Sequence, residues 1–132
     1  KSEQDSAEGL DEITLENDYY RKYIIDNYFL TNYNKNPNLA QLSKKLNLST
    51  VQTHRILKKT YGKSFCRIIA SLRMEQAKRL LLQTDMAANE ISEAIGDPAA
   101  HNFYAAFRAN VGMTPMQYRK ECMQIHNIEN EN

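Results

Sequence analysis

A short helix, a tight turn and a longer helix are predicted twice in this chain of 132 residues. In both copies, apolar side chains recur three or four positions apart, which is the spacing of one helix face. The first copy covers residues 39–61 and the second covers residues 88–111. Gly62 and Gly112 follow the longer helices, and glycine readily adopts the left-handed backbone that ends a helix. No segment alternates apolar and polar residues as a strand does, so we predict an all-α protein.

Capping signals set the remaining helix boundaries. Ser49 precedes the longer helix of the first copy, and Ser64 precedes a helix that continues to about residue 84. Asp97 and Thr114 each stand before a proline, which is favoured at the first position of a helix, so both are predicted N-caps. With one further helix over residues 18–34, the pattern predicts about seven helices.

Composition divides the chain into five predicted segments. Both ends are polar and charged, so both are predicted to be flexible. Because the chain does not begin with Met, we expect it to be a piece of a longer protein, with a processed terminus as the alternative. The segments are an acidic flexible leader over 1–17, a first helix-turn-helix subdomain over 18–63, a long linker helix over 64–84, a second helix-turn-helix subdomain over 85–122 and a flexible tail over 123–132.

The formal net charge of +1 conceals two regions of opposite sign. Residues 1–20 carry one lysine and seven carboxylates, a net charge of −6, so the rest of the chain carries +7. Residues 35–73 contain nine Lys or Arg and no Asp or Glu. Such a block either faces a polyanion or forms a solvated surface, and its place on the helices decides between the two. Residues 74–120 have zero net charge, so the first copy is expected to be the electrostatic anchor.

The sequence lacks the residues that several classes of protein require. No run of about 18 apolar residues could span a membrane, and the acidic start is no secretory signal. Cys66 and Cys122 have no further ligands at metal-binding spacing, so no metal is expected. Two buried thiols in a reducing cytoplasm are favoured over one disulfide. Without a Gly-rich phosphate loop or a nucleophile beside a base, we expect neither an enzyme nor a cofactor.

The repeated pattern suits DNA. In a helix-turn-helix unit the second helix lies in the major groove, about 12 Å wide, while the first helix crosses the backbone. A helix over residues 64–84 would be roughly 30 Å long, close to the ~34 Å of one duplex turn. We therefore expect the linker helix to place two recognition helices in successive major grooves on one face of the duplex.

Residues 39–119 resemble the DNA-binding domain of AraC/XylS-type bacterial transcription regulators. The resemblance implies sequence-specific binding of double-stranded DNA by the output domain of a cytoplasmic regulator. It also implies a sensor domain upstream and RNA polymerase as a further partner. The matching residues are Glu90-Ile91, Ile95-Gly96, Phe103, Phe107-Arg108, Gly112, Thr114-Pro115 and Tyr118-Arg119 in the second half, and Leu39-Ala40, Ser49, Arg55, Lys58, Gly62, Arg73, Ala77 and Leu80-Leu81 in the first.

On the first recognition helix, the resemblance assigns base contacts to Val51, His54 and Arg55. Together with Lys58 they share one helix face. Arg55 can pair bidentately with guanine, Val51 can touch a thymine methyl group, and His54 can donate to an acceptor. Packing is the alternative for Val51, and a phosphate contact or ion pair is the alternative for Arg55. Lys58 and Lys59 are expected at phosphates or in solvent.

On the second recognition helix, the resemblance assigns base-facing positions to Ala100, His101 and Ala105. Alanine offers only a methyl contact, so His101 is expected to be the main polar reader and this copy to contribute less specificity. Helix starts can add backbone N–H groups that bind phosphate. The remaining expected phosphate contacts are Ser49, Lys63, Ser64, Asn102, Tyr104, Arg108 and Thr114.

The rival hypothesis is a helical module that binds a partner protein through its Leu- and Tyr-rich faces. The acidic leader and the two alanines of the second recognition helix favour it. Salt dependence separates the two hypotheses, because binding through several phosphates weakens steeply as salt rises. Both can hold together if the regulator also contacts RNA polymerase.

Overall fold

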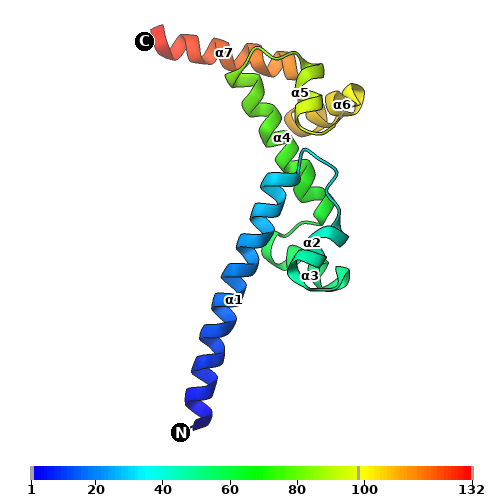
Figure 1. The fold of residues 1–132 in the computed structure, drawn as a ribbon. Coiled ribbons are helices and arrows are strands. Elements are labelled where there is room, and N and C mark those ends of the chain that lie inside the picture. The colour runs from blue at the N-terminus through cyan, green and yellow to red at the C-terminus, as the bar shows by residue number, and fades with distance from the viewer. Residues whose placement is uncertain (1, 98, 132) are drawn as a thin grey trace. The chain divides into compact units, whose positions relative to one another are not determined.

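The computed structural model describes the backbone of residues 2–97 and 99–131 and the side chains of residues 17–97 and 99–128. These residues form seven α-helices and no strand (Figure 1), which confirms the predicted all-α class. None of the described helices has the length and hydropathy needed to cross a membrane. The helices are α1 (Ser2–Asn32), α2 (Leu39–Leu46), α3 (Thr50–Tyr61), α4 (Phe65–Gln83), α5 (Ala88–Ala94), α6 (Ala100–Val111) and α7 (Pro115–Glu131).

Contacts between residues divide the chain into two units. The first unit contains the residues up to Asn32 together with Pro37–Phe65, and the second contains Tyr33–Asn36 together with the residues from Cys66 onward. Each unit holds one helix-turn-helix, α2 with α3 in the first and α5 with α6 in the second. From Cys66 onward, α4 therefore belongs to the second unit, whereas the sequence predicts it as a separate linker.

The core of the first unit forms where the second half of α1 packs against the helix-turn-helix. Ile25, Tyr28 and Phe29 of α1 are buried, and the ring of Phe29 lies 5.3 Å from the ring of Phe65 between centroids. Burying each such side chain contributes about 1.5–3 kcal/mol to folding. The hydroxyl of Tyr28 also accepts the backbone N–H of Asn38 at 3.1 Å. Since Asn38 is the N-cap of α2, α1 fixes the position where the helix-turn-helix begins.

Both helix-turn-helix units make their turn in the same way. The residue after α2 is Asn47, with φ of 57°, and the corresponding residue after α5 is Gly96, with φ of 86°. A left-handed residue at this position closes a Schellman motif, which satisfies the last carbonyl groups of the helix. The bonds run from the N–H of Asn47 to Lys44 (3.2 Å), of Leu48 to Ser43 (3.0 Å), of Gly96 to Glu93 (3.1 Å) and of Asp97 to Ser92 (2.9 Å).

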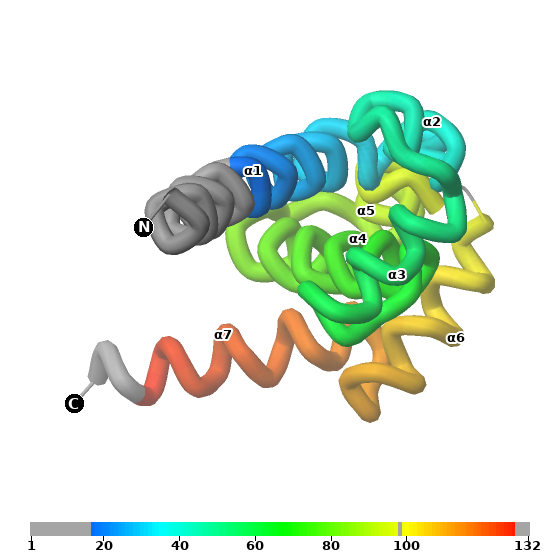
Figure 2. Tube along the Cα trace, turned by 90° about the horizontal axis from the view of Figure 1, so that it is seen from below, coloured from blue at the N-terminus to red at the C-terminus, as the bar shows by residue number. Residues whose placement is uncertain are grey.

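The core of the second unit is a cluster of buried side chains from α4, α5 and α6. Phe103 and Phe107 of α6 are fully buried, with their ring centroids 5.9 Å apart. Tyr118 of α7 packs against the cluster, with its ring 5.5 Å from that of Phe107. From there α7 continues away from α6 as one helix (Figure 2). The other buried members are Ala77, Leu81, Ala88, Ile91 and Ile95.

Two arginines hold loops of the second unit in place. Arg119 of α7 donates from Nε to the carbonyl of Leu81 and from Nη2 to the carbonyl of Met86, both at 2.7 Å. These bonds tie the junction between α4 and α5 to α7. Arg73 of α4 donates from Nε to the carbonyl of Tyr33 at 3.0 Å, which holds the segment Tyr33–Asn36. Each guanidinium group therefore donates hydrogen bonds to backbone carbonyls of residues that are distant in sequence.

The structure corrects the predicted ends of the chain. α1 begins at Ser2, so the predicted flexible leader over 1–17 is helical over its described part. α7 continues to Glu131, through the predicted flexible tail over 123–132. Both segments contain no proline and many Glu, Gln and other residues with good helix propensity. Polar composition therefore does not prevent the helices from continuing.

Asp97 is not the N-cap of α6, as the sequence predicts. The cap residue is Ala99, and within the described residues no side chain caps this helix. Asp97 instead serves the end of α5, because its backbone N–H donates to Ser92 and its carbonyl accepts the hydroxyl of Ser92. The proline that the prediction used, Pro98, lies outside the described residues.

The two cysteines are free thiols. The sequence predicts both to be buried, but neither is. Cys66 is exposed because it lies beside the buried stripe of α4, which contains Phe65, Ile68 and Ile69. Cys122 on α7 is half-buried.

Candidate nucleic-acid interface

The first recognition helix, α3, leaves the predicted DNA-facing side chains uncovered. Val51 is 59% exposed, and His54, Arg55 and Lys58 are exposed as well. The opposite face of α3 holds Thr53 and Leu57, both fully buried, so the helix is anchored from behind. The predicted phosphate contacts Lys59 and Lys63 are also exposed, while Ser64 is half-buried. The exposed fraction of Val51 shows that the larger part of its surface is not covered within this chain.

A capping box holds the start of α3. The hydroxyl of Ser49 accepts the N–H of Gln52 at 3.1 Å, and the side-chain oxygen of Gln52 accepts the N–H of Ser49 at 3.0 Å. The hydroxyl of Thr53 donates to the carbonyl of Ser49 at 2.9 Å, which lets a polar side chain occupy a fully buried position. Thr114 and Gln117 repeat the same box at the start of α7, at 3.2 and 3.0 Å. Two of the hydroxyl groups predicted to contact phosphate, those of Ser49 and Thr114, thus accept a hydrogen bond within their own helix start.

The basic block over residues 35–73 is divided by the structure. The side chains of Arg55, Lys58, Lys59 and Lys63 are on or directly after α3 and are exposed. Arg73, by contrast, is half-buried and bonds to backbone carbonyls. One of the nine charges is therefore structural, and four of the others lie on or directly after the recognition helix of the first unit.

On α6 the uncovered residues are again those predicted to face DNA, with one exception. His101 and Ala105 are exposed, whereas Ala100 is half-buried. Tyr104 is 37% exposed. Asn102 and Arg108, the other predicted phosphate contacts on this helix, are exposed.

The two recognition helices repeat with an offset of 50 residues. Each has 12 residues and is followed by a left-handed glycine, Gly62 or Gly112. The buried positions Thr53 and Leu57 of α3 correspond to Phe103 and Phe107 of α6. The turn before α6 is one residue longer, so α2 and α5 correspond with an offset of 49. Gly62 and Gly112 indicate this register in the sequence, and the burial pattern establishes it.

The register pairs each exposed residue of α3 with one of α6. Val51 corresponds to His101, His54 to Tyr104, Arg55 to Ala105, and Lys58 to Arg108. Tyr104, predicted at the backbone, thus occupies the position of a predicted base reader. Ala100 corresponds to Thr50, which was not a predicted contact.

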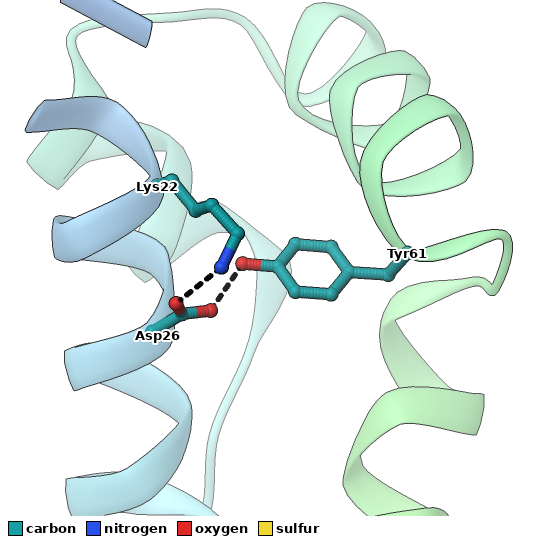
Figure 3. Close-up of polar contacts among 3 residues, drawn as sticks. All are labelled: Lys22, Asp26 and Tyr61. Carbon is teal, nitrogen blue, oxygen red and sulfur yellow. Dashed lines mark hydrogen bonds and ion pairs between the residues drawn. The ribbon is translucent and has the colours of Figure 1, made fainter. Parts of the chain in front are cut away.

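Sequence reasoning missed a polar cluster that joins α1 to the end of α3 (Figure 3). The carboxylate of Asp26 accepts a hydrogen bond from the ammonium group of Lys22 at 2.9 Å through Oδ2 and one from the hydroxyl of Tyr61 through Oδ1. The ammonium group also lies 5.9 Å from the centroid of the Tyr61 ring. Burial, and then the hydrogen bond and charge of Asp26, raise the pKa of Tyr61 above its ordinary value. The phenol therefore stays a donor at neutral pH. Only the spacing of Lys22 and Asp26 on one helix face is visible in sequence.

The described residues offer no alternative site for metal chemistry. Nowhere in that part of the chain do three His, Cys, Asp or Glu side chains come together as metal ligands would.

Known proteins share the region that holds the exposed faces of α3 and α6. A family model described as "Helix-turn-helix domain" matches residues 42–121. The xylose operon regulatory protein of Haemophilus influenzae is 31% identical over 84 residues, which cover 64% of this chain and 22% of that protein. The chain thus spans less than a quarter of that relative's length.

Two solved structures have the same fold. The C-terminal domain of the two-component response regulator yesN from Fusobacterium nucleatum is 35% identical, with a TM-score of 0.69, over 74% of this chain and 96% of that one. The DNA-binding domain of AdpA in complex with a target DNA has a TM-score of 0.69 over 76% of this chain and 90% of that one. At 19% identity, that likeness shows the fold alone. The chain belongs to the helix-turn-helix family of AraC/XylS-type DNA-binding domains of transcription regulators.

Proposed function

We propose that this chain is the output domain of a bacterial transcription regulator and binds double-stranded DNA sequence-specifically. The observation that carries the proposal is the repeat of one uncovered helix face, at an offset of 50 residues, on two helices anchored by buried side chains. A single exposed helix is common, but two matched faces on helix-turn-helix units are what major-groove reading requires.

In the proposed complex, α3 supplies most of the affinity. Arg55 pairs with a guanine, His54 donates to a base acceptor, and Val51 contacts a thymine methyl group. Lys58 and Lys59 neutralise phosphates. The further phosphate contacts proposed for the first unit are Ser49, Lys63 and Ser64, with the N–H groups at the start of α4.

The second recognition helix adds less charge and a different set of readers. His101 and Tyr104 are the polar side chains on its proposed base-facing surface, since Tyr104 occupies the position of His54. Ala105 contributes a methyl contact, and half-buried Ala100 contributes less. Arg108 contacts phosphate at the position of Lys58. Asn102 and Thr114 are the remaining proposed phosphate contacts.

The proposal places the two recognition helices in successive major grooves of one duplex, which are about 34 Å apart. The proposed setting is the bacterial cytoplasm, with a sensor domain upstream and RNA polymerase as a further partner. The domain itself would act without catalysis or cofactor.

Fluorescence anisotropy with a random 25-base-pair duplex tests the proposal. The four proposed phosphate contacts by Lys and Arg side chains would weaken binding roughly 150-fold between 50 and 200 mM salt. Arg55→Ala should weaken binding at both concentrations. Arg79→Ala is the matched control, because Arg79 is exposed on α4 outside both recognition helices. A folded chain that does not bind DNA even at 50 mM salt would refute the proposal.

A partner-protein module remains the second candidate, and one observation favours it. α1 exposes Tyr19, Tyr20, Tyr23 and Leu30, each more than 60%. Apolar side chains at such density are typical of protein interfaces. Binding to a partner through them would depend little on salt, in contrast to binding through phosphates.

A further inference from the structure

Tyr61 is the last residue of the first recognition helix, and α1 holds it in three ways. Its hydroxyl donates to Asp26, and the ammonium group of Lys22 lies over its ring (Figure 3). Its ring edge also meets the ring of Phe29, at 6.5 Å between centroids and an interplanar angle of 75°. Both the hydroxyl and the ring of this side chain therefore interact with residues of α1.

This contact affects the position of α3 because a space is left between α1 and α3 beside it. A half-open pocket of about 400 Å³ separates the two helices there, lined in part by Ile25 of α1 and by Ile56 and Lys59 of α3. Thr53 and Leu57 anchor α3 from behind, and the contact of Tyr61 with α1 adds a further point of attachment at the end of the helix. After Tyr61 the chain continues through Gly62, where a side chain would meet no described atom within 4 Å.

We propose that Asp26 is a positioning residue for DNA reading: through the hydroxyl of Tyr61, it fixes the orientation of the last turns of α3. The inference rests on the proposed function. Arg55 and Lys58 lie one to two helical turns before Tyr61, so a tilt at Tyr61 would move both. A bidentate contact between Arg55 and a base depends on orientation, whereas a phosphate contact of Lys58 tolerates a shift. Loss of the bond should therefore reduce selective binding more than general binding.

Because Asp26 is charged, the two explanations of its role predict opposite changes in DNA affinity when it is removed. Asp26 is a carboxylate in a unit whose residues 35–65 contain no Asp or Glu. If it acted through charge alone, its removal would tighten binding to every duplex, because one repulsion of phosphate would be lost. Positioning predicts the opposite sign for a selected duplex. Asp18→Ala is the matched control, since it removes the same charge from the same helix, and the described partner of Asp18 is Arg21 on α1, at 3.8 Å.

The experiment measures dissociation constants for two duplexes of 25 base pairs at moderate salt. One is selected from a random pool by the wild-type chain, and the other is the same sequence scrambled. Asp26→Ala and Tyr61→Phe should each weaken binding to the selected duplex about tenfold, as expected for one charge-assisted hydrogen bond. Binding to the scrambled duplex should weaken by less than about twofold. The double variant should be no weaker than either single one, because both remove the same contact.

Three results would overturn the inference. The first is tighter binding of Asp26→Ala to both duplexes, as charge alone predicts. The second is an unchanged preference for the selected duplex in folded Asp26→Ala and Tyr61→Phe, measured well below their melting temperatures. The third is a loss of preference in Asp18→Ala equal to that in Asp26→Ala.

Hydrogen exchange separates this inference from the proposed function. If the wild-type chain selects no DNA sequence, the proposed function fails by that result alone. The amide groups of Lys58–Tyr61 can still be compared in wild type and Tyr61→Phe without DNA. Faster exchange there, with unchanged exchange in α2, supports the positioning contact, and unchanged exchange in both helices refutes it.

Discussion

Gly96 should be the glycine of the second unit least able to accept a side chain. Its φ is 86°, and a Cβ built there would lie 2.8 Å from three backbone atoms of Asn34. Gly112 has nearly the same φ, 85°, but no described atom lies within 4 Å of its Cβ position. Comparing alanine substitutions at Gly96 and Gly112 therefore distinguishes the cost of backbone strain from the cost of overlap with a neighbouring residue.

The left-handed backbone costs an alanine about 1–2 kcal/mol at either site. At Gly96, backbone atoms of Asn34 must also move, and forcing atoms into a packed site costs about 1–3 kcal/mol more. We therefore expect Gly96→Ala to lower the free energy of unfolding by about 2–5 kcal/mol and Gly112→Ala by about 1–2 kcal/mol. Urea denaturation followed by circular dichroism measures both. Equal losses in the two variants would refute the close approach between this turn and the segment Tyr33–Asn36.

Three further predictions concern single side chains. Arg119→Ala should cost about 2–3 kcal/mol, because the carbonyls of Leu81 in α4 and Met86 before α5 lose a charged donor. Urea denaturation measures the loss, and full recovery with Arg119→Lys would contradict a role for the forked guanidinium. Tyr61 has a raised pKa in the folded chain, so its stabilising contribution is present at neutral pH and is lost as pH rises above its ordinary pKa of 10.0. Tyr61→Phe should therefore show a shallower alkaline loss of stability in denaturant titrations at several pH values. Thr114→Ala should cost about 1 kcal/mol as the loss of a true N-cap, while Asp97→Ala should stay within about 0.5 kcal/mol, and the reverse order in melting experiments would reinstate Asp97 as a cap.

The two units divide the proposed task unequally. The first unit has four exposed cations on or directly after α3, whereas Arg108 is the basic residue of α6. Electrostatic attraction should therefore bring α3 to DNA first and increase the association rate. The aromatic ring of Tyr104 and the imidazole of His101 then contribute through contact rather than charge. Selection experiments should accordingly find a longer and better defined half-site for the first unit.

Most helix boundaries were predictable because their signals are local. A capping residue such as Ser49 bonds to an N–H three positions later, and a glycine such as Gly62 acts through its own backbone. Both effects need no distant partner. The predictions failed where one local signal had two possible roles. Asp97 fitted the start of α6 but closes the end of α5, and the polar ends of the chain, predicted to be flexible, continue as helix.

Part of the interface could also be predicted from local sequence signals. Helical spacing placed Val51, His54 and Arg55 on one face, and the structure leaves all three uncovered. Their contacts with DNA stay a prediction. The spacing did not show which residues of α6 correspond to them, and the burial pattern establishes that register.

The sequence by itself determined the all-α class, the two helix-turn-helix units and the outward face of α3. Tertiary structure alone decided the roles of residues whose partners are distant in the chain. Arg73 reaches a carbonyl 40 residues away, Arg119 one 38 residues away, and Tyr61 a carboxylate 35 residues away. In sequence, these side chains look like surface charge or an ordinary aromatic. Each of these side chains donates to a backbone carbonyl or a carboxylate. The packing of whole helices decides which of these acceptors come within its reach.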